Sequence, residues 1–258
     1  MQERLLHIWI VMWATLVESV RRKDLYVVWL LAVCGIGAGA VMSTIGVRGL
    51  ETFLRDVTLT VINLLSTAVC IWLAARQMPE ELSRRTLFPL LARPVRRGDV
   101  LLGKFLAVWL LSCGALLVLG GIAWAGLSLF RAGIGPIYLH YLALRALSFG
   151  PITALTMALS LVTSSAATVV LSGLLTLFGT MFARSLAEAV RAGHPLEPLL
   201  KAVYFTFPHL DLFDLSQRAA YNYPPLQPWV LGALALYAAG YVAVFLSLGS
   251  MRFRRMAV

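Results

Sequence analysis

Apolar residues gather in six runs, each near the length of about 20 residues that a helix needs to cross a bilayer. The runs cover residues 25–45, 57–75, 100–125, 142–162, 167–187 and 229–248. The second run is interrupted by Asn63 and by several threonines, and the fifth contains Arg184. The pattern predicts an all-α membrane protein with six transmembrane helices.

The first residues have a different pattern. Residues 5–17 are apolar but too short to span a membrane. The polar residues around them recur at helical spacing and form a stripe that only Val11 interrupts: Arg4, His7, Thr15, Glu18 and Arg22. This predicts an amphipathic helix over residues 3–22 that lies in the membrane interface. A cleaved signal peptide is the alternative, but Glu3 and Glu18 flank the run and no small-residue cleavage site follows it.

The composition strengthens the membrane assignment. Hydrophobic residues make up 60% of the chain and charged residues 13%, and the mean hydropathy is +0.82. Soluble domains have about 45–50% apolar and about 25% charged residues. This excludes an ordinary soluble enzyme, a disordered segment and a disulfide-rich secreted module. The three cysteines, Cys34, Cys70 and Cys113, lie inside apolar runs, where we interpret them as small buried hydrophobes.

The net charge of +10 is explained by membrane topology rather than by nucleic-acid binding, because the basic residues stand beside the apolar runs. Short connections carry the strongest bias. The connection 77–99 contains Arg84, Arg85, Arg93, Arg96 and Arg97, and the tail contains Arg252, Arg254 and Arg255. The positive-inside rule therefore predicts that both termini are cytoplasmic. We see no repeat and no soluble domain, so residues 1–258 are interpreted as one transmembrane domain.

The connection 77–99 is the best candidate for a docking element. Pro79 suits the first turn of a helix, and Glu80 and Glu81 suit the positive end of its dipole. Arg84 and Arg85 follow four residues later, at the spacing of ion pairs along one helical face. We expect Pro89 to end this short helix. A charged, rigid helix between two spans suits a cytoplasmic partner; a solvated loop whose arginines only set the topology is the alternative.

Residues 81–106 resemble the segment after the second span in permeases of ABC-2 type ATP-binding-cassette transporters. The matching elements are an acidic residue, a Thr-Leu pair, a short apolar stretch, a turn with Pro-Val-x-Arg, and Leu-Leu-Gly-Lys before the third span. Here they are Glu81, Thr86-Leu87, Leu90-Leu91, Ala92-Arg93-Pro94-Val95-Arg96-Arg97 and Leu101-Leu102-Gly103-Lys104. Arg85 stands where this family often has glycine.

The resemblance implies a function for two parts of the chain. Residues 79–88 would be the coupling helix, which contacts a separate ATPase subunit through Glu80, Glu81, Arg84, Arg85 and Thr86. The region before the last span, which we expect to form short outer helices, would gate the outer mouth near Phe207, Pro208, Asp211 and Asp214. ATP is then used by the partner subunit, and this chain binds no cofactor.

The resemblance also implies an exporter in the bacterial cytoplasmic membrane, in which the permease forms a homodimer or pairs with a similar permease. The stretch 98–104 matches most of a P-loop, but Phe105 stands where Ser or Thr must hold Mg²⁺, so we expect no ATPase site in this chain.

Functions other than transport find less support in the residues. An intramembrane enzyme needs catalytic residues inside the spans, and we find no such set. His209, Asp211 and Asp214, with His194, are spaced loosely enough to be surface polar residues rather than a metal site. Snorkelling to the headgroups explains His140, Arg145 and Arg184.

A non-transporting membrane scaffold or assembly factor is the alternative to the transporter. The apolar spans favour a lipid-like or amphiphilic cargo.

Overall fold

The computed structural model describes residues 2–20, 50–83, 97–129, 132–191 and 208–255. All secondary structure in these ranges is helical, which confirms the predicted fold class for this part of the chain. The helices are α1 (Gln2–Val20), α3 (Leu50–Ser83), α5 (Arg97–Leu129), α6 (Ile137–Ser160), α7 (Ser165–Arg191), η1 (Leu210–Phe213), α9 (Ser216–Ala220) and α10 (Pro228–Arg255).

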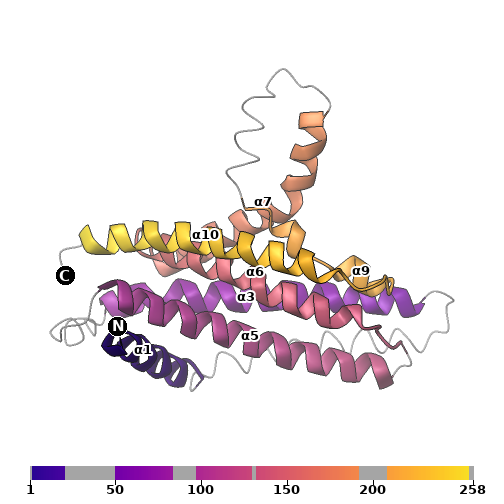
Figure 1. The fold of residues 1–258 in the computed structure, drawn as a ribbon, viewed down its shortest axis with the longest axis horizontal. Coiled ribbons are helices and arrows are strands. Elements are labelled where there is room, and N and C mark those ends of the chain that lie inside the picture. Colours follow the sequence, from indigo (N-terminus) through magenta and orange to yellow (C-terminus); the bar gives the residue numbers. More distant parts are fainter. Residues whose placement is uncertain (1, 21–49, 84–96, 130–131, 192–207, 256–258) are drawn as a thin grey trace.

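Four long helices, α3, α5, α6 and α10, lie side by side in an elongated bundle (Figure 1). Helices α3, α6 and α10 run in one direction, and α5 runs in the opposite direction (Figure 1). Helix α6 contacts the other three. We call the end where α3 and α10 terminate the α1 end, because α1 lies there, and the opposite end the α9 end. Helix α1 and the last turn of α10 therefore lie at the same end of the bundle (Figure 1), as expected if both termini are on one side of the membrane.

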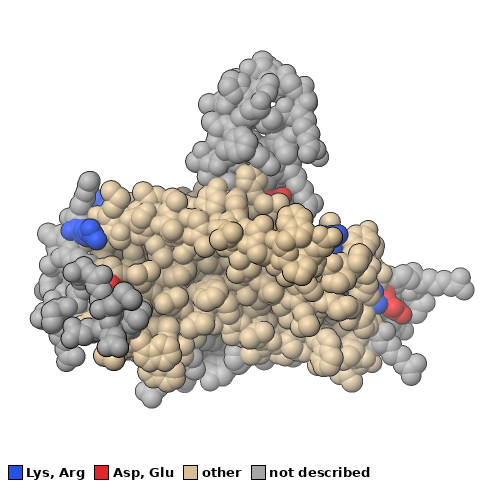
Figure 2. All heavy atoms as spheres, viewed as in Figure 1, with Lys and Arg blue, Asp and Glu red and all other residues tan. Residues whose placement is uncertain are grey.

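Four described helices are long and apolar enough to cross a membrane: Glu51–Glu80, Gly98–Leu129, Ile137–Ser160 and Pro228–Arg254. They overlap the predicted spans 57–75, 100–125, 142–162 and 229–248. The predicted span 167–187 falls in α7, where the apolar stretch among the described side chains is Ser165–Thr180 and the side chains of residues 181–191 are not described. The predicted span 25–45 lies outside the described residues. On the visible face, charged side chains lie mainly towards the ends of the bundle, separated by a broad uncharged belt (Figure 2). Long apolar helices and this belt are the features of a membrane protein.

Helix α3 differs from the prediction at its end. It continues without interruption through Pro79 to Ser83, so the expectation that a new helix begins at Pro79 is wrong. Proline inside a helix removes one backbone hydrogen bond. Here Met78 is fully buried in the apolar core, and Arg76 pairs with Glu80 across the proline. These contacts stabilise the helix where the sequence suggests a boundary.

Helix α1 packs against α5, and the two helices approach closely at Gly103. A Cβ atom on Gly103 of α5 would lie 2.9 Å from the backbone oxygen of Ile8, so only glycine allows this approach. Val11 and Thr15, which lie on the predicted polar stripe, are buried in the protein. The exposed face is apolar instead and carries Leu6, Trp9, Ile10 and Trp13. The helix itself is confirmed, and its place in the membrane interface stays a prediction.

Candidate functional site

A group of polar side chains lies inside the bundle, towards the α9 end. Asn63 and Thr67 belong to α3, Arg145 belongs to α6, and Asp214 lies between η1 and α9. We call these four residues the polar centre. Ionisable residues within membrane spans are costly and usually functional, so this group is the candidate site.

Arg145 is the buried cation of the polar centre. It lies about 12 Å along α6 from the start of that helix, at 1.5 Å per residue, and only 4% of its surface is exposed. Its Nη2 donates to the backbone oxygen of Asn63 at 2.8 Å and to the hydroxyl of Thr67. Its guanidinium carbon stands 5.5 Å from the ring centre of Phe149. The expectation that Arg145 snorkels to the headgroups is therefore wrong, because its side chain points into the protein.

Asp214 is the anion of the polar centre. The side-chain amide of Asn63 donates to its Oδ2 at 3.2 Å, and the backbone N–H of Ser216 donates to its Oδ1 at 2.9 Å. The second bond closes a local turn that leads into α9. Asp214 and Arg145 attract each other electrostatically without direct contact, and Asn63 bonds to both. Asn63 thus bridges the two charges.

The residues that carry Asp214 are folded into the bundle rather than laid on its surface. The short helices expected before the last span are present as η1 and α9, which contact α3, α6 and α7. Non-helical backbone at membrane depth is tolerated only where protein buries it. Here the buried side chains include Leu210, Phe213, Leu215, Ala219 and Ala220. We call residues 208–223 the outer segment, after the side of the membrane that the positive-inside rule predicts for them.

The start of the outer segment is held between α7 and α10. A Cβ atom on Gly179 of α7 would lie 3.0 Å from the backbone oxygen of Pro208, so the backbones approach closely there. The hydroxyl of Tyr237 on α10 accepts the backbone N–H of His209 at 2.9 Å. This end of the outer segment is thus fixed through its backbone.

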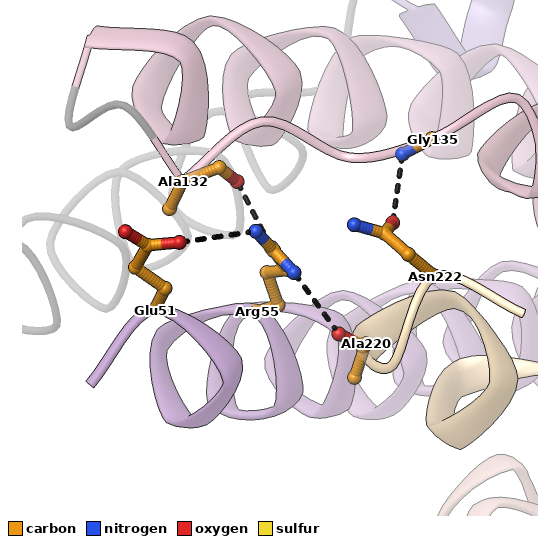
Figure 3. A network of polar contacts seen from close by, with 6 residues as sticks. All are labelled: Glu51, Arg55, Ala132, Gly135, Ala220 and Asn222. Atoms are coloured by element: carbon orange, nitrogen blue, oxygen red, sulfur yellow. Dashed lines mark hydrogen bonds and ion pairs between the residues drawn. The ribbon is translucent and has the colours of Figure 1, made fainter. Parts of the chain in front are cut away.

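A second polar network holds the other end of the outer segment (Figure 3). Arg55 on α3 donates to the backbone oxygens of Ala132, at 3.1 Å, and Ala220, at 3.5 Å, and pairs with Glu51. Asn222 accepts the backbone N–H of Gly135 at 2.8 Å. Its φ of 52° is one that asparagine adopts more readily than most residues. We call this group the rim network.

The predicted ATPase contact falls mostly outside the described residues. Glu80 ends the apolar part of α3, at the α1 end, and pairs with Arg76. Glu81 belongs to α3, but its side chain is not among those described. Arg84, Arg85 and Thr86 lie outside the described residues. Their contact with an ATPase stays a prediction.

The predicted gate residues are only partly brought together. Phe207 lies outside the described residues, Pro208 is buried beside α7, and Asp211 is half-buried in η1. Asp214 alone belongs to the polar centre. Within the described ranges no three His, Cys, Asp or Glu side chains come close enough to hold a metal ion.

Sequence reasoning missed the partners of Asp214. In the sequence, Asn63 is only an interruption of the second apolar run, and snorkelling to the headgroups is sufficient to explain Arg145. Thr67 follows Asn63 by four residues, which places both on one helical face. A polar stripe on one span and a cation in another were the available signal for a buried contact.

The chain can be assigned to a family. A family model described as "Protein of unknown function (DUF2705)" matches residues 40–258, and the chain therefore belongs to this family. The match includes every helix from α3 onwards, and with them the polar centre and the rim network. No curated protein was found to match the chain.

Proposed function

We propose that this member of the DUF2705 family is the transmembrane permease subunit of an ABC-2 type transporter. A separate ATPase subunit drives it, and it exports its cargo. Two permease chains, identical or similar, form the pathway, and neither hydrolyses ATP itself. The proposal starts from the resemblance of residues 81–106 and from the membrane-length helices.

The observation that carries the proposal is the continuity of α3. This single helix of 34 residues holds Glu80 near one end and Arg55 near the other. Asn63 and Thr67 lie between them. A displacement applied near Glu80, where the ATPase is expected to dock, can therefore be carried along α3 to the side chains that hold the outer segment.

The outer segment supplies the second part of the argument. Its short helices are wedged among α3, α6 and α7 and are held by side chains of α3. The segment packs its apolar side chains into the bundle and is also tied to α3 by polar bonds, so a movement of α3 would act on it directly. We assign it the role of the gate at the α9 end, which opens when α3 moves.

Co-purification tests the proposal. The tagged chain, extracted from its host in mild detergent, is expected to bring a nucleotide-binding ATPase in stoichiometric amount, identified by mass spectrometry. Recovery of the chain alone, or only with proteins that are not ATPases, would favour a scaffold instead.

Substitutions at the expected docking helix test the coupling. Replacing Glu80, Glu81, Arg84 and Arg85 together by alanine is expected to reduce stimulation of the partner's ATPase by about fivefold or more, the usual lower range of coupling between sites. Arg252→Ala, an exposed residue at the same end of the bundle, is the control and should leave stimulation unchanged. Unchanged stimulation in the fourfold variant would remove the assignment of this helix.

A further inference from the structure

The guanidinium of Arg145 has more hydrogen-bonding capacity than its described neighbours use. Both of its hydrogen bonds to them come from Nη2. Among the described residues, its Nε is buried without a partner, and so is Oδ1 of the neighbouring Asn63. Guanidinium groups carry five N–H donors and usually bind carboxylate or phosphate with two of them in parallel. The Arg145 side chain is thus incompletely satisfied in this state.

The anion that compensates Arg145 belongs to a separate part of the chain. Asp214 attracts it electrostatically but leaves its unused donors without contact. Arg145, Asn63 and Thr67 are fixed on long helices, whereas Asp214 lies on the outer segment. If the outer segment moves away, the arginine loses this counter-charge, and an uncompensated buried charge is strongly unfavourable.

We propose that Arg145 binds the anionic headgroup of an amphiphilic cargo, and that Asp214 occupies the role of this anion while the outer segment is closed. The inference rests on the proposed function, because it names the cargo that passes the gate. Release of Asp214 and binding of the cargo anion favour each other, because the cargo anion restores the counter-charge that Arg145 loses when Asp214 moves away.

The surroundings of Arg145 favour an amphiphile over a small anion. The ring of Phe149 lies next to the guanidinium and is fully buried in the apolar core that also contains Leu144. A free inorganic anion would lose its hydration among apolar side chains, and nothing else in the anion would offset this desolvation cost. An anion attached to acyl chains gains from the same walls.

Lipid binding to the purified full-length chain tests the proposal. Native mass spectrometry in detergent would compare dioleoyl phosphatidylglycerol, which is anionic, with dioleoyl phosphatidylcholine, which has the same chains and no net charge. We expect the anionic lipid to bind at least about fivefold more tightly, the lower range of such coupling. Arg145→Gln should remove this preference, and Arg145→Lys should retain it.

Asp214→Asn gives the decisive result, because the two charges should act in opposite directions. It is expected to increase affinity for phosphatidylglycerol and to leave phosphatidylcholine unchanged, since it removes the internal competitor. Arg218→Gln, an exposed arginine on α9, is the matched control and should keep the wild-type preference. Inorganic phosphate at millimolar concentration should not displace the bound lipid.

Three outcomes would overturn the proposal: a preference that survives Arg145→Gln, an Asp214→Asn variant that binds the anionic lipid more weakly, or displacement of the lipid by inorganic phosphate. The last would show a site for small anions. The experiment needs no ATPase, so its result is separate from the transporter proposal. Co-purification of an ATPase with any of these outcomes would leave the transporter standing and remove only the cargo.

Discussion

Replacing Asp214 by leucine is expected to lower the free energy of unfolding by about 1–3 kcal/mol, the range for leaving a polar group inside the protein without its partner. Arg145 would remain buried without its counter-charge, and Asn63 would lose the acceptor for its side-chain amide. The double variant, Asp214→Leu with Arg145→Met, should recover most of the loss, because it leaves no buried charge. Thermal unfolding in detergent, followed by the fluorescence of the 7 tryptophans, measures the effect.

Asp211→Leu is the matched control for this prediction. Asp211 lies on the same outer segment, and its Oδ1 is buried without a hydrogen-bond partner among the described residues. Replacing Asp211 therefore breaks no hydrogen bond at this atom. We expect a change below about 1 kcal/mol. A double variant no more stable than Asp214→Leu alone would show that the two charges do not depend on each other.

Replacing Gly103 by valine is expected to release α1 from α5 and to cost about 1–3 kcal/mol, as overpacking of a core usually does. The added Cβ would meet the backbone oxygen of Ile8 at 2.9 Å and the side chain of Val11 at 3.0 Å. A backbone atom cannot rotate away, so the two helices must separate.

Cross-linking measures this separation. The amide at the end of the Gln77 side chain donates to Ser19 at 3.3 Å, so cysteines placed at these two positions should be joined by a short bis-methanethiosulfonate cross-linker, which replaces the reach of the glutamine, when α1 is docked. The yield should fall in Gly103→Val and stay unchanged in Gly114→Val, because a Cβ on Gly114 of the same helix meets nothing within 4 Å. Equal yields in both variants would refute the close contact.

The long helices could be predicted from the sequence, because apolar runs of membrane length admit few other structures. The prediction failed at the end of α3, where charged residues and Pro79 suggest a boundary. The burial of Met78 and the pair between Arg76 and Glu80 outweigh that local signal. Helix ends are set partly by such packing, which a local pattern does not contain.

The polar centre could not be predicted, for a different reason. Arg145 bonds to Asn63 across 82 residues of chain, and Asn63 bonds to Asp214 across 151. Each residue is visible in the sequence, but only the arrangement of helices shows that they meet. An arginine near the end of a span is expected to snorkel to the headgroups. Arg145 is buried instead, because polar groups of α3 accept its hydrogen bonds inside the bundle.

The role of Gly103 was also hidden. As part of the motif Leu-Leu-Gly-Lys, this residue supports the family resemblance, but the motif indicates no physical task for it. In the structure it is the point where α1 approaches α5. Lys104 beside it is buried, which is unusual for a lysine and which its place next to a span did not suggest.

Accessibility of the outer segment during ATP hydrolysis tests the central claim most directly. In a chain whose three cysteines are replaced, Ala219→Cys on α9 is buried at rest, and Gln217→Cys on the same helix is exposed. A membrane-impermeant maleimide should label position 217 quickly in every state. It should label position 219 slowly without ATP and faster when the co-purified ATPase turns over, or when Asp214→Asn weakens the closed state. Labelling of position 219 that stays equally slow under both conditions would contradict the account of the outer segment as a gate.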